Sequence, residues 1–192
     1  MELFDQLYGI LFTPYNTLQD IAYEEPVIKA LGVSFIASFI LMLGIILSYP
    51  VILYNWFLAA ILPLITAAAS IIILFIITLF LFLVAHLLDG RGTYFSLLST
   101  LGFSRFILIF GIFKILLLNY TEFNNLLPNI LSLIILFWLI VLTVYSISAS
   151  QNLSTGKAVL SLGITIVTVI ASVSLFVMTF TLLIGAIIGT PL

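Results

Sequence analysis

Residues 63–88 contain no Asp, Glu, Lys or Arg, and this uncharged run constrains the fold more than any other feature of the chain. A transmembrane helix needs about 20 predominantly apolar residues to cross a hydrocarbon core of about 30 Å. Only 6% of the 192 residues are charged, whereas a water-soluble domain carries about 25%. The sequence therefore predicts an all-α, polytopic membrane protein whose surface is mostly covered by lipid.

Four further apolar runs are long enough to span a bilayer, and polar breaks separate them. The third run has a clearly apolar part only from Gly102 onward and contains Arg105 and Lys114, so its helix must begin near Tyr94. Residues 89–93, with two glycines, are predicted to form a tight turn, because glycine readily adopts positive φ. The five predicted spans are residues 30–48, 63–88, 94–118, 128–150 and 158–189.

Residues 1–26 do not form a span, because Asp5, Gln6 and Pro14 interrupt their apolar stretch. Five apolar residues recur at helical spacing, whereas Asp5 and Gln6 fall on the other face. This pattern predicts an amphipathic helix that lies in the membrane interface. We therefore divide the chain into an interfacial N-terminal segment, residues 1–26, and a five-span transmembrane domain, residues 27–192. The five apolar residues are Leu3, Leu7, Tyr8, Leu11 and Phe12.

The distribution of basic residues predicts the orientation of the spans. Four basic residues fall at the N-terminal side of the predicted topology, and only Lys114 lies toward the other side. Lys and Arg near span ends are retained on the cytosolic side of a membrane. We therefore expect a multi-pass protein of the cytoplasmic membrane, with its N-terminus in the cytosol and its C-terminus outside. The four basic residues are Lys29, Arg91, Arg105 and Lys157.

The charges on this predicted cytosolic side are the candidate binding residues. Glu25 and Lys29 are four residues apart, a spacing at which helical side chains pair. Two interpretations remain open. The charges anchor and orient the spans, or they form a platform that docks a cytosolic protein or an anionic lipid. The candidate platform comprises Glu24, Glu25, Lys29, Asp89, Arg91, Arg105 and Lys157.

Lys114 is the candidate intramembrane charge, because ionisable residues within spans mark functional sites. Its side chain reaches the outer interface by snorkelling, or it faces a cavity in the bundle and holds an anionic headgroup or a substrate carboxylate. No pattern supports catalysis. Cys is absent, and His86 is the only histidine, so neither thiolate chemistry nor a paired-histidine metal site is expected. We expect no catalytic residues, no metal and no cofactor, and the net charge of −2 argues against nucleic-acid binding.

Three stretches, taken in their order along the chain, carry a family resemblance. They are residues 14–26 ending in Glu24-Glu25-Pro26, residues 86–104 with Asp89-Gly90-Arg91-Gly92-Thr93, and residues 152–158 before the last span. Together with the span count, they resemble the Yip family, the Ypt/Rab-GTPase-interacting membrane proteins with a five-span domain. The long cytosolic N-terminal region of the eukaryotic members is missing, so the resemblance is to a short prokaryotic-type member. Rab binding is not carried over.

The resemblance implies a membrane scaffold or a transport-related protein. Our first hypothesis is a non-enzymatic adaptor or lipid-organising scaffold that acts through its cytosolic face. Its partners are then the lipid bilayer and a cytosolic protein or an anionic lipid, and a homo-oligomer remains open. The alternative is a permease or lipid-handling protein for a neutral or apolar solute. The last span offers this alternative four hydroxyl groups near one helical face, although such groups also bond the carbonyls of their own helix: Thr165, Thr168, Ser172 and Thr179.

Overall fold

The computed structural model describes residues 2–48, 56–120 and 126–188, and every regular element within these residues is a helix. Five helical segments of this part are long and apolar enough to cross a membrane. The predicted all-α architecture with five spans is therefore confirmed. Four spans are single helices: α3 (Val27–Ser48), α5 (Trp56–Leu87), α8 (Leu126–Gln151) and α9 (Thr155–Ile188). The predicted breaks at 49–56 and 119–125 lie largely outside the described residues, but Trp56 belongs to α5, and Asn119 and Tyr120 belong to α7.

The third span consists of three consecutive helical pieces. They are α6 (Tyr94–Ser104), the 3₁₀ helix η1 (Arg105–Phe110) and α7 (Gly111–Tyr120). The helix begins at Tyr94 because the Thr93 hydroxyl caps it, accepting a hydrogen bond from the Ser96 N–H at 2.9 Å. The sequence predicted from the required span length that this helix begins near Tyr94, and that prediction is correct. A stretch of 3₁₀ helix inside a longer helix is unusual and often marks strain or function.

Four predicted span starts, at 30, 63, 128 and 158, lie later than the helix starts in the structure, and two of the four are prolines. α5 begins at Trp56 and contains Pro63 in its interior, whereas the sequence predicted that Pro63 begins the span. Interior proline is tolerated in membrane helices, because neighbouring groups and local adjustment satisfy the freed backbone. α8 begins at Leu126, so Pro128 occupies its first turn, where the N–H groups have no intrahelical partner in any case.

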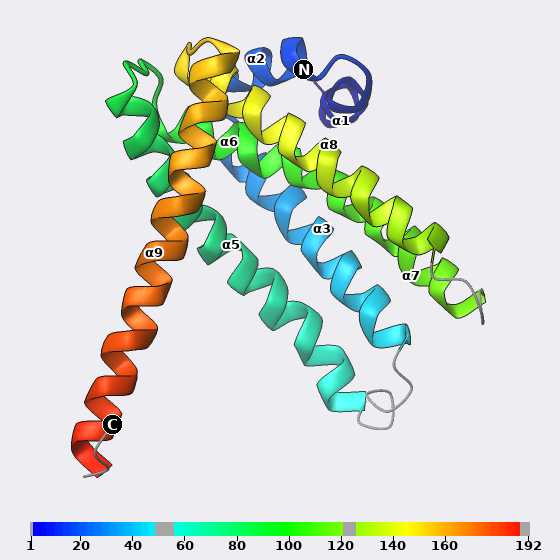
Figure 1. Cartoon of the computed structure of the whole chain (residues 1–192). Coiled ribbons are helices and arrows are strands. Elements are labelled where there is room, and N and C mark those ends of the chain that lie inside the picture. The colour runs from blue at the N-terminus through cyan, green and yellow to red at the C-terminus, as the bar shows by residue number, and fades with distance from the viewer. Residues whose placement is uncertain (1, 49–55, 121–125, 189–192) are drawn as a thin grey trace.

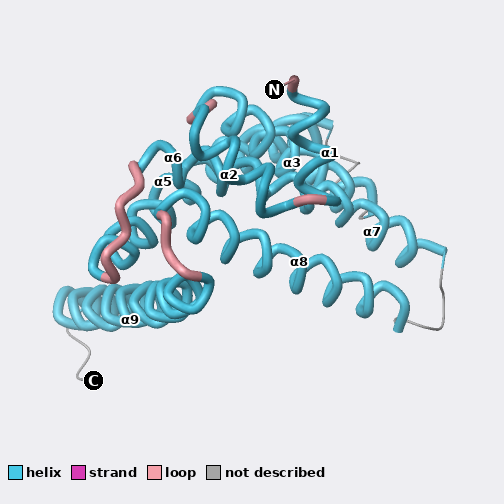
Figure 2. Tube along the Cα trace, turned by 90° about the horizontal axis from the view of Figure 1, so that it is seen from above, coloured by secondary structure: helices cyan, strands magenta, loops and turns pink. Residues whose placement is uncertain are grey.

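The spans alternate in direction, and the two ends of the chain lie at opposite ends of the bundle (Figure 1). We call one end the N-terminal face. It carries the short helices α1 (Leu3–Phe12) and α2 (Pro14–Glu24), the α5–α6 loop (residues 88–93) and the α8–α9 loop (residues 152–154). Seen from above, both loops lie on the same side of the molecule, and α2 lies close to the start of α6 (Figure 2). Away from this face the spans diverge, and α9 separates furthest from the others (Figure 1).

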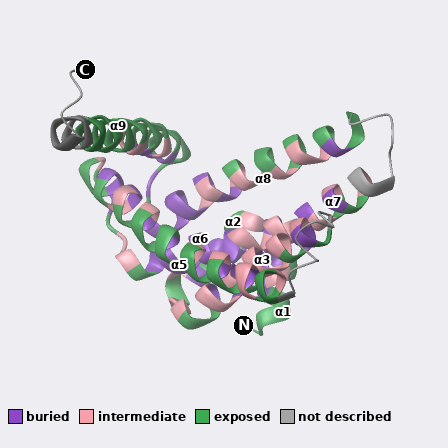
Figure 3. Cartoon of the chain, turned by 90° about the horizontal axis from the view of Figure 1, so that it is seen from below, coloured by how far each residue is buried: buried purple, intermediate pink, exposed green. Residues whose placement is uncertain are grey.

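The centre of the packing lies in α6, close to the N-terminal face. Every residue from Ser96 to Ser104 is buried, whereas every described side chain of α9 beyond Ile170 is exposed (Figure 3). Gly102 permits this close packing, because a Cβ at its position would lie 2.9 Å from the Cβ of Ala30 in α3. The bundle is therefore tight at the N-terminal face and open toward lipid at the other end.

The N-terminal helices belong to this packed region. Ile10 of α1 and Leu18 and Ile21 of α2 are fully buried in one cluster with Phe103 of α6 and Leu142 of α8. α1 is oriented differently from the prediction. It buries Gln6, which the amphipathic pattern placed on the polar face. It exposes an aromatic stripe of Phe4, Tyr8 and Phe12 at exposed fractions of 81%, 65% and 66%.

Candidate functional site

Three separate segments of the chain meet at the N-terminal face: the end of α2, the α5–α6 loop and the end of α8. The Ser96 hydroxyl donates to the Ala22 carbonyl at 2.9 Å and joins α6 to α2. The Gln151 side-chain amide donates to the Thr93 carbonyl at 3.1 Å. The Arg91 N–H donates to the Gln151 carbonyl at 3.0 Å. These hydrogen bonds link the ends of α2, α6 and α8 and the α5–α6 loop into one polar surface.

Glu25 occupies the junction between α2 and α3 in a left-handed conformation, with φ of 48°. Its N–H donates to the Ile21 carbonyl at 2.9 Å, which ends α2. Its carboxylate accepts a hydrogen bond from the Thr93 hydroxyl of the α5–α6 loop. The same Thr93 hydroxyl group therefore donates to the Glu25 carboxylate at the end of α2 and accepts the hydrogen bond that caps α6. The predicted Glu25–Lys29 ion pair does not form in the described structure, since the Glu25 carboxylate contacts Thr93 instead.

The α5–α6 loop is the predicted tight turn. Its glycines, however, are not needed for positive φ, although the sequence suggested that they are. The residue with positive φ is Asp89, at 70°, and aspartate tolerates this region. Gly90 and Gly92 are required for space. A Cβ at Gly90 would lie 2.7 Å from the Ala85 carbonyl oxygen, and a Cβ at Gly92 would overlap the Ser150 carbonyl. The glycines thus let the loop pack directly onto the ends of α5 and α8.

Asp89 of the α5–α6 loop and Lys157 in the first turn of α9 form an ion pair, with 2.8 Å between Nζ and Oδ2. The Lys157 ammonium also donates to the Leu88 carbonyl at 2.9 Å, at the end of α5. The hydrogen bond from Lys157 and its positive charge lower the pKa of Asp89 from its ordinary value. Both side chains are well exposed, so the pair contributes little to stability.

On the opposite side of this surface, α1 is attached to the end of α2. The Gln6 side-chain amide donates to the Glu24 carboxylate at 3.2 Å. Gln6 is fully buried, and its amide oxygen has no hydrogen-bond partner in the described residues. The contact therefore explains why this polar side chain faces the bundle and not water.

A polar hollow lies where the three segments meet. It has a volume of about 310 Å³. The Ser150 hydroxyl, which belongs to its lining, is buried and has no hydrogen-bond partner among the described residues. A second hollow of about 350 Å³, lined by Gln19, Asp20, Tyr23 and Glu24, shares two residues with the first. The polar hollow is lined by Gln19, Ala22, Tyr23, Glu25, Gly92, Thr93, Ser96, Ala149, Ser150 and Asn152.

Six of the seven candidate platform residues lie at this face. Glu24, Glu25, Asp89 and Lys157 take part in the contacts described above. Lys29, in the first turn of α3, and Arg91, in the α5–α6 loop, are exposed. The sequence did not indicate Gln6, Thr93, Ser96 or Gln151 as site residues. Gln151 could have been identified from the sequence, because it is a polar amide side chain at the end of an apolar span.

Arg105 does not lie at the N-terminal face. It begins η1, inside the third span, and is half-buried. Its Nη1 donates to the Ser70 carbonyl of α5 at 2.8 Å and contacts the Ser34 hydroxyl of α3 at 3.4 Å. Lys114 lies on α7, half-buried, and makes no hydrogen bond or ion pair with a described residue. The chain thus carries two basic residues within its third span.

Most of the hydroxyl groups near one face of the last span donate hydrogen bonds to carbonyls of their own helix. Thr168 donates to the Ile164 carbonyl at 2.9 Å, and Ser172 donates to the Thr168 carbonyl at 2.8 Å. Thr179 bonds the Leu175 carbonyl in the same way. Only Thr165 differs, because its hydroxyl is buried and unpartnered in the described residues. These hydroxyl groups therefore do not form a continuous polar path.

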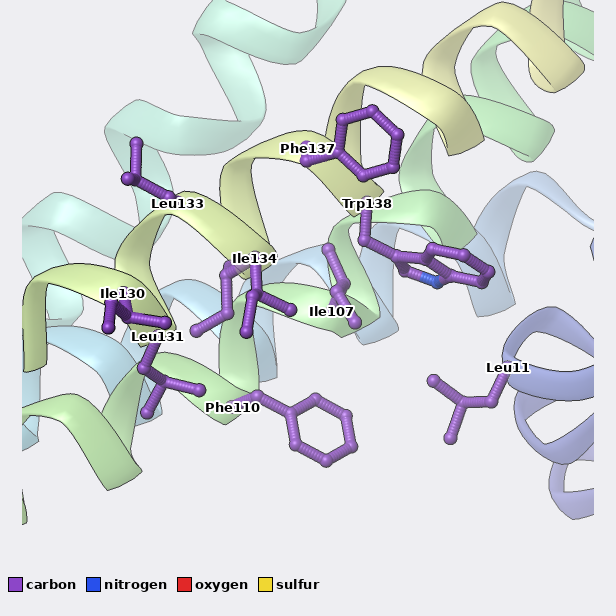
Figure 4. Close-up of a pocket in the computed structure, with 10 residues that line it drawn as sticks. Leu11, Ile107, Phe110, Ile130, Leu131, Leu133, Ile134, Phe137 and Trp138 are labelled. Atoms are coloured by element: carbon purple, nitrogen blue, oxygen red, sulfur yellow. The ribbon is translucent and has the colours of Figure 1, made fainter. Parts of the chain in front are cut away.

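One cavity has a lining of almost entirely apolar side chains. It has a volume of about 510 Å³ and lies between α8, η1 and α1. Figure 4 shows Leu11 of α1 on one side, with Phe110 and Trp138 on the other. No charged side chain lines it. Within residues 2–48, 56–120 and 126–188, no group of three or more His, Asp or Glu side chains is placed to hold a metal ion.

Comparison with known proteins places the chain in a family. Searches of curated proteins and of solved structures find no match. The family model of the Yip1 domain matches residues 8–178, which include α2, the first four spans and α9 as far as Met178. The chain therefore belongs to the Yip1 domain family of membrane proteins.

Proposed function

We propose that this protein is a non-enzymatic membrane adaptor or scaffold that holds a partner protein at its N-terminal face, and that this face is cytosolic. The observation that carries the proposal is the polar surface of the N-terminal face. Residues from α2, the α5–α6 loop and the end of α8 are hydrogen-bonded to one another around the polar hollow. A surface that is fixed before binding loses little conformational entropy when a partner docks.

The charge around the two hollows favours a protein partner over an anionic lipid. Asp20, Glu24 and Glu25 line the hollows, whereas none of the chain's five Lys and Arg residues does. Acidic side chains repel the anionic headgroups of a bilayer and attract basic side chains of a protein. The Ser150 hydroxyl adds a buried group that can accept or donate a hydrogen bond. The expected partner therefore presents a basic segment to this face.

The exposed aromatic stripe of α1 supports the scaffold part of the proposal. Phe4, Tyr8 and Phe12 project from the side of α1 that does not pack on the bundle. Aromatic side chains partition into the membrane interface. In this arrangement α1 anchors the N-terminal face at the level of the headgroups, so that a docked partner is held against the membrane. The alternative function, a permease, receives no comparable support from the hydroxyl groups of α9.

A photo-crosslinking experiment tests the docking proposal. A photoreactive amino acid at Asn152, which lines the polar hollow, should capture the partner, whereas the same residue at Val173 of α9 should capture lipid. Asp20→Lys should abolish capture at Asn152. Glu2→Lys is the matched control, since it makes the same charge change at a residue outside both hollows. Equal capture in the two charge-reversal variants contradicts the proposal.

Cysteine labelling tests the orientation separately. The chain has no native Cys, so a single Ser154→Cys variant carries one thiol in the exposed α8–α9 loop. We expect a membrane-impermeant maleimide to label this thiol in inside-out vesicles and not in intact cells. Labelling of intact cells would place the N-terminal face outside and refute the cytosolic assignment.

A further inference from the structure

Arg105 lies deep in the membrane-spanning part of the chain. It follows the 11 residues of α6, the helix that begins at the N-terminal face. At 1.5 Å per residue this places it about 16 Å along the span, near the middle of a hydrocarbon core of about 30 Å. A charged side chain at that depth is costly, and such residues pair with a counter-charge or mark a ligand pathway. The partners of Arg105 therefore need to be identified.

The protein supplies no counter-charge for this guanidinium. None of the seven acidic residues falls within the five candidate spans. The contacts of Arg105 are the neutral Ser70 carbonyl and Ser34 hydroxyl, and both use Nη1. A guanidinium has five N–H donors, and Nε and Nη2 donate to no residue in the described part of the chain. A positive charge with free donors thus remains inside the bundle.

Arg105 lines a cleft between α9 and the rest of the bundle. The cleft has a volume of about 430 Å³ and extends between α5, α6, η1, α8 and α9. Its walls are mainly apolar, with Leu74, Ile77 and Leu81 on α5 facing Ile166 and Ile170 on α9. Away from the N-terminal face α5 and α9 separate (Figure 1). Ile166 and Ile170 of the cleft wall are 50% and 61% exposed, so the cleft is accessible to hydrocarbon chains along α9.

Two polar groups in this cleft have unused hydrogen-bonding capacity. One is the Arg105 guanidinium. The other is the Thr165 hydroxyl, which is 3% exposed and has no partner among the described residues. The remaining hydroxyls of the lining are engaged: Ser104 bonds Ser146 at 2.7 Å, and Thr143 donates to the Leu139 carbonyl at 2.8 Å. The free groups thus come from opposite sides of the same cleft, on η1 and α9.

We propose that this cleft binds the anionic group of a membrane amphiphile, with the carboxylate or phosphate held by Arg105 and Thr165 and the apolar chain lying between α5 and α9. Guanidinium groups bind both anions through two parallel hydrogen bonds. The ligand then supplies the counter-charge that the spans lack, and a cavity of this volume lies within the range of small-molecule sites. The site lies inside the bundle and is independent of partner docking at the N-terminal face.

The test uses the full chain in phosphatidylcholine nanodiscs and a fatty acid that carries a photoreactive diazirine in its chain. We expect labelled peptides from α5 and α9. Competition with unlabelled oleic acid, phosphatidic acid or oleyl alcohol identifies the group that is recognised. Displacement by oleic acid alone identifies a carboxylate source, and displacement by phosphatidic acid identifies a phosphate source. Equal displacement by the uncharged oleyl alcohol overturns the proposal.

Matched variants test the two residues. Arg105→Gln should lower labelling of α5 and α9 about tenfold, because it removes the charge-assisted hydrogen bonds. Thr165→Val should lower it about threefold, whereas Thr168→Val should leave it unchanged, since the Thr168 hydroxyl bonds its own helix. Size-exclusion profiles and melting temperatures report whether each variant folds. If Arg105→Gln does not fold, the comparison of labelling between Thr165→Val and Thr168→Val tests the site. Equal labelling of these two variants refutes the site.

Discussion

Replacing Gly92 with Ala tests how the two loops of the N-terminal face pack on each other. The added Cβ would overlap the Ser150 carbonyl and lie 2.9 Å from Nε2 of Gln151. The neighbour is backbone, so it cannot swing aside, and the α5–α6 loop must move away from α8. Two hydrogen bonds cross this contact: the Arg91 N–H to the Gln151 carbonyl, and the Gln151 amide to the Thr93 carbonyl.

The expected loss follows from these contacts. Overpacking of a filled site costs about 1–3 kcal/mol, and each of the two hydrogen bonds contributes about 1 kcal/mol. We therefore expect Gly92→Ala to lower the free energy of unfolding by roughly 3 to 5 kcal/mol. The measurement is reversible unfolding in mixed micelles, in which increasing SDS denatures the protein and the midpoint reports stability.

Gly156→Ala is the matched control for this experiment. Gly156 lies in the first turn of α9, close to the α8–α9 loop, and a Cβ there meets no atom within 4 Å. Alanine in place of glycine should leave stability unchanged or raise it by up to about 0.5 kcal/mol. If Gly92→Ala and Gly156→Ala unfold at the same midpoint, the loop does not pack on Ser150 and the reasoning is wrong.

Three further predictions concern other contacts. Since Lys157 lowers the pKa of Asp89 in the folded protein, the pair stabilises the fold above the unfolded pKa of about 3.9 and is lost as the pH falls through the folded pKa. In an NMR titration Lys157→Gln should raise the pKa of Asp89, and an unchanged value contradicts the pair. Gly102→Ala should destabilise the α3–α6 contact by about 1–3 kcal/mol, whereas Gly32→Ala, where a Cβ meets nothing within 4 Å, should not. A double-mutant cycle of Ser104→Ala and Ser146→Ala, whose hydroxyls lie 2.7 Å apart, should give a coupling energy of about 0.6 kcal/mol. A coupling of zero would exclude their hydrogen bond.

The spans were predictable because long uncharged runs leave a chain no alternative to crossing lipid. Their ends were less predictable, and Pro63 shows why. The sequence rule that proline begins a helix applies in water, whereas inside a membrane bundle the helix continues through it. The start at Tyr94 was predictable from length alone, and the Thr93 cap supplies its physical cause.

The candidate site was only partly predictable. Charged residues near the span ends, such as Asp89 and Lys157, stand out in an apolar sequence, so their location at one face followed from the topology. The contacts between Thr93 and Glu25, and between Gln151 and Thr93, join residues far apart in the chain, and no local pattern specifies them. The predicted topology places Arg105 at this face with the other three basic residues, whereas the structure places it inside the third span. Its depth depends on where α6 begins and on the groups it contacts in α3 and α5.

The length of α9 has a consequence for how the protein responds to its membrane. Its 34 residues extend over about 51 Å, which exceeds a hydrocarbon core of about 30 Å. A helix that long must tilt or extend beyond the core, and the cost of each depends on bilayer thickness. From Ala171 to Thr181 its side chains are exposed, so neighbouring helices hold only its first half. We therefore expect the inclination of the remaining half of α9 to follow the thickness of the surrounding bilayer.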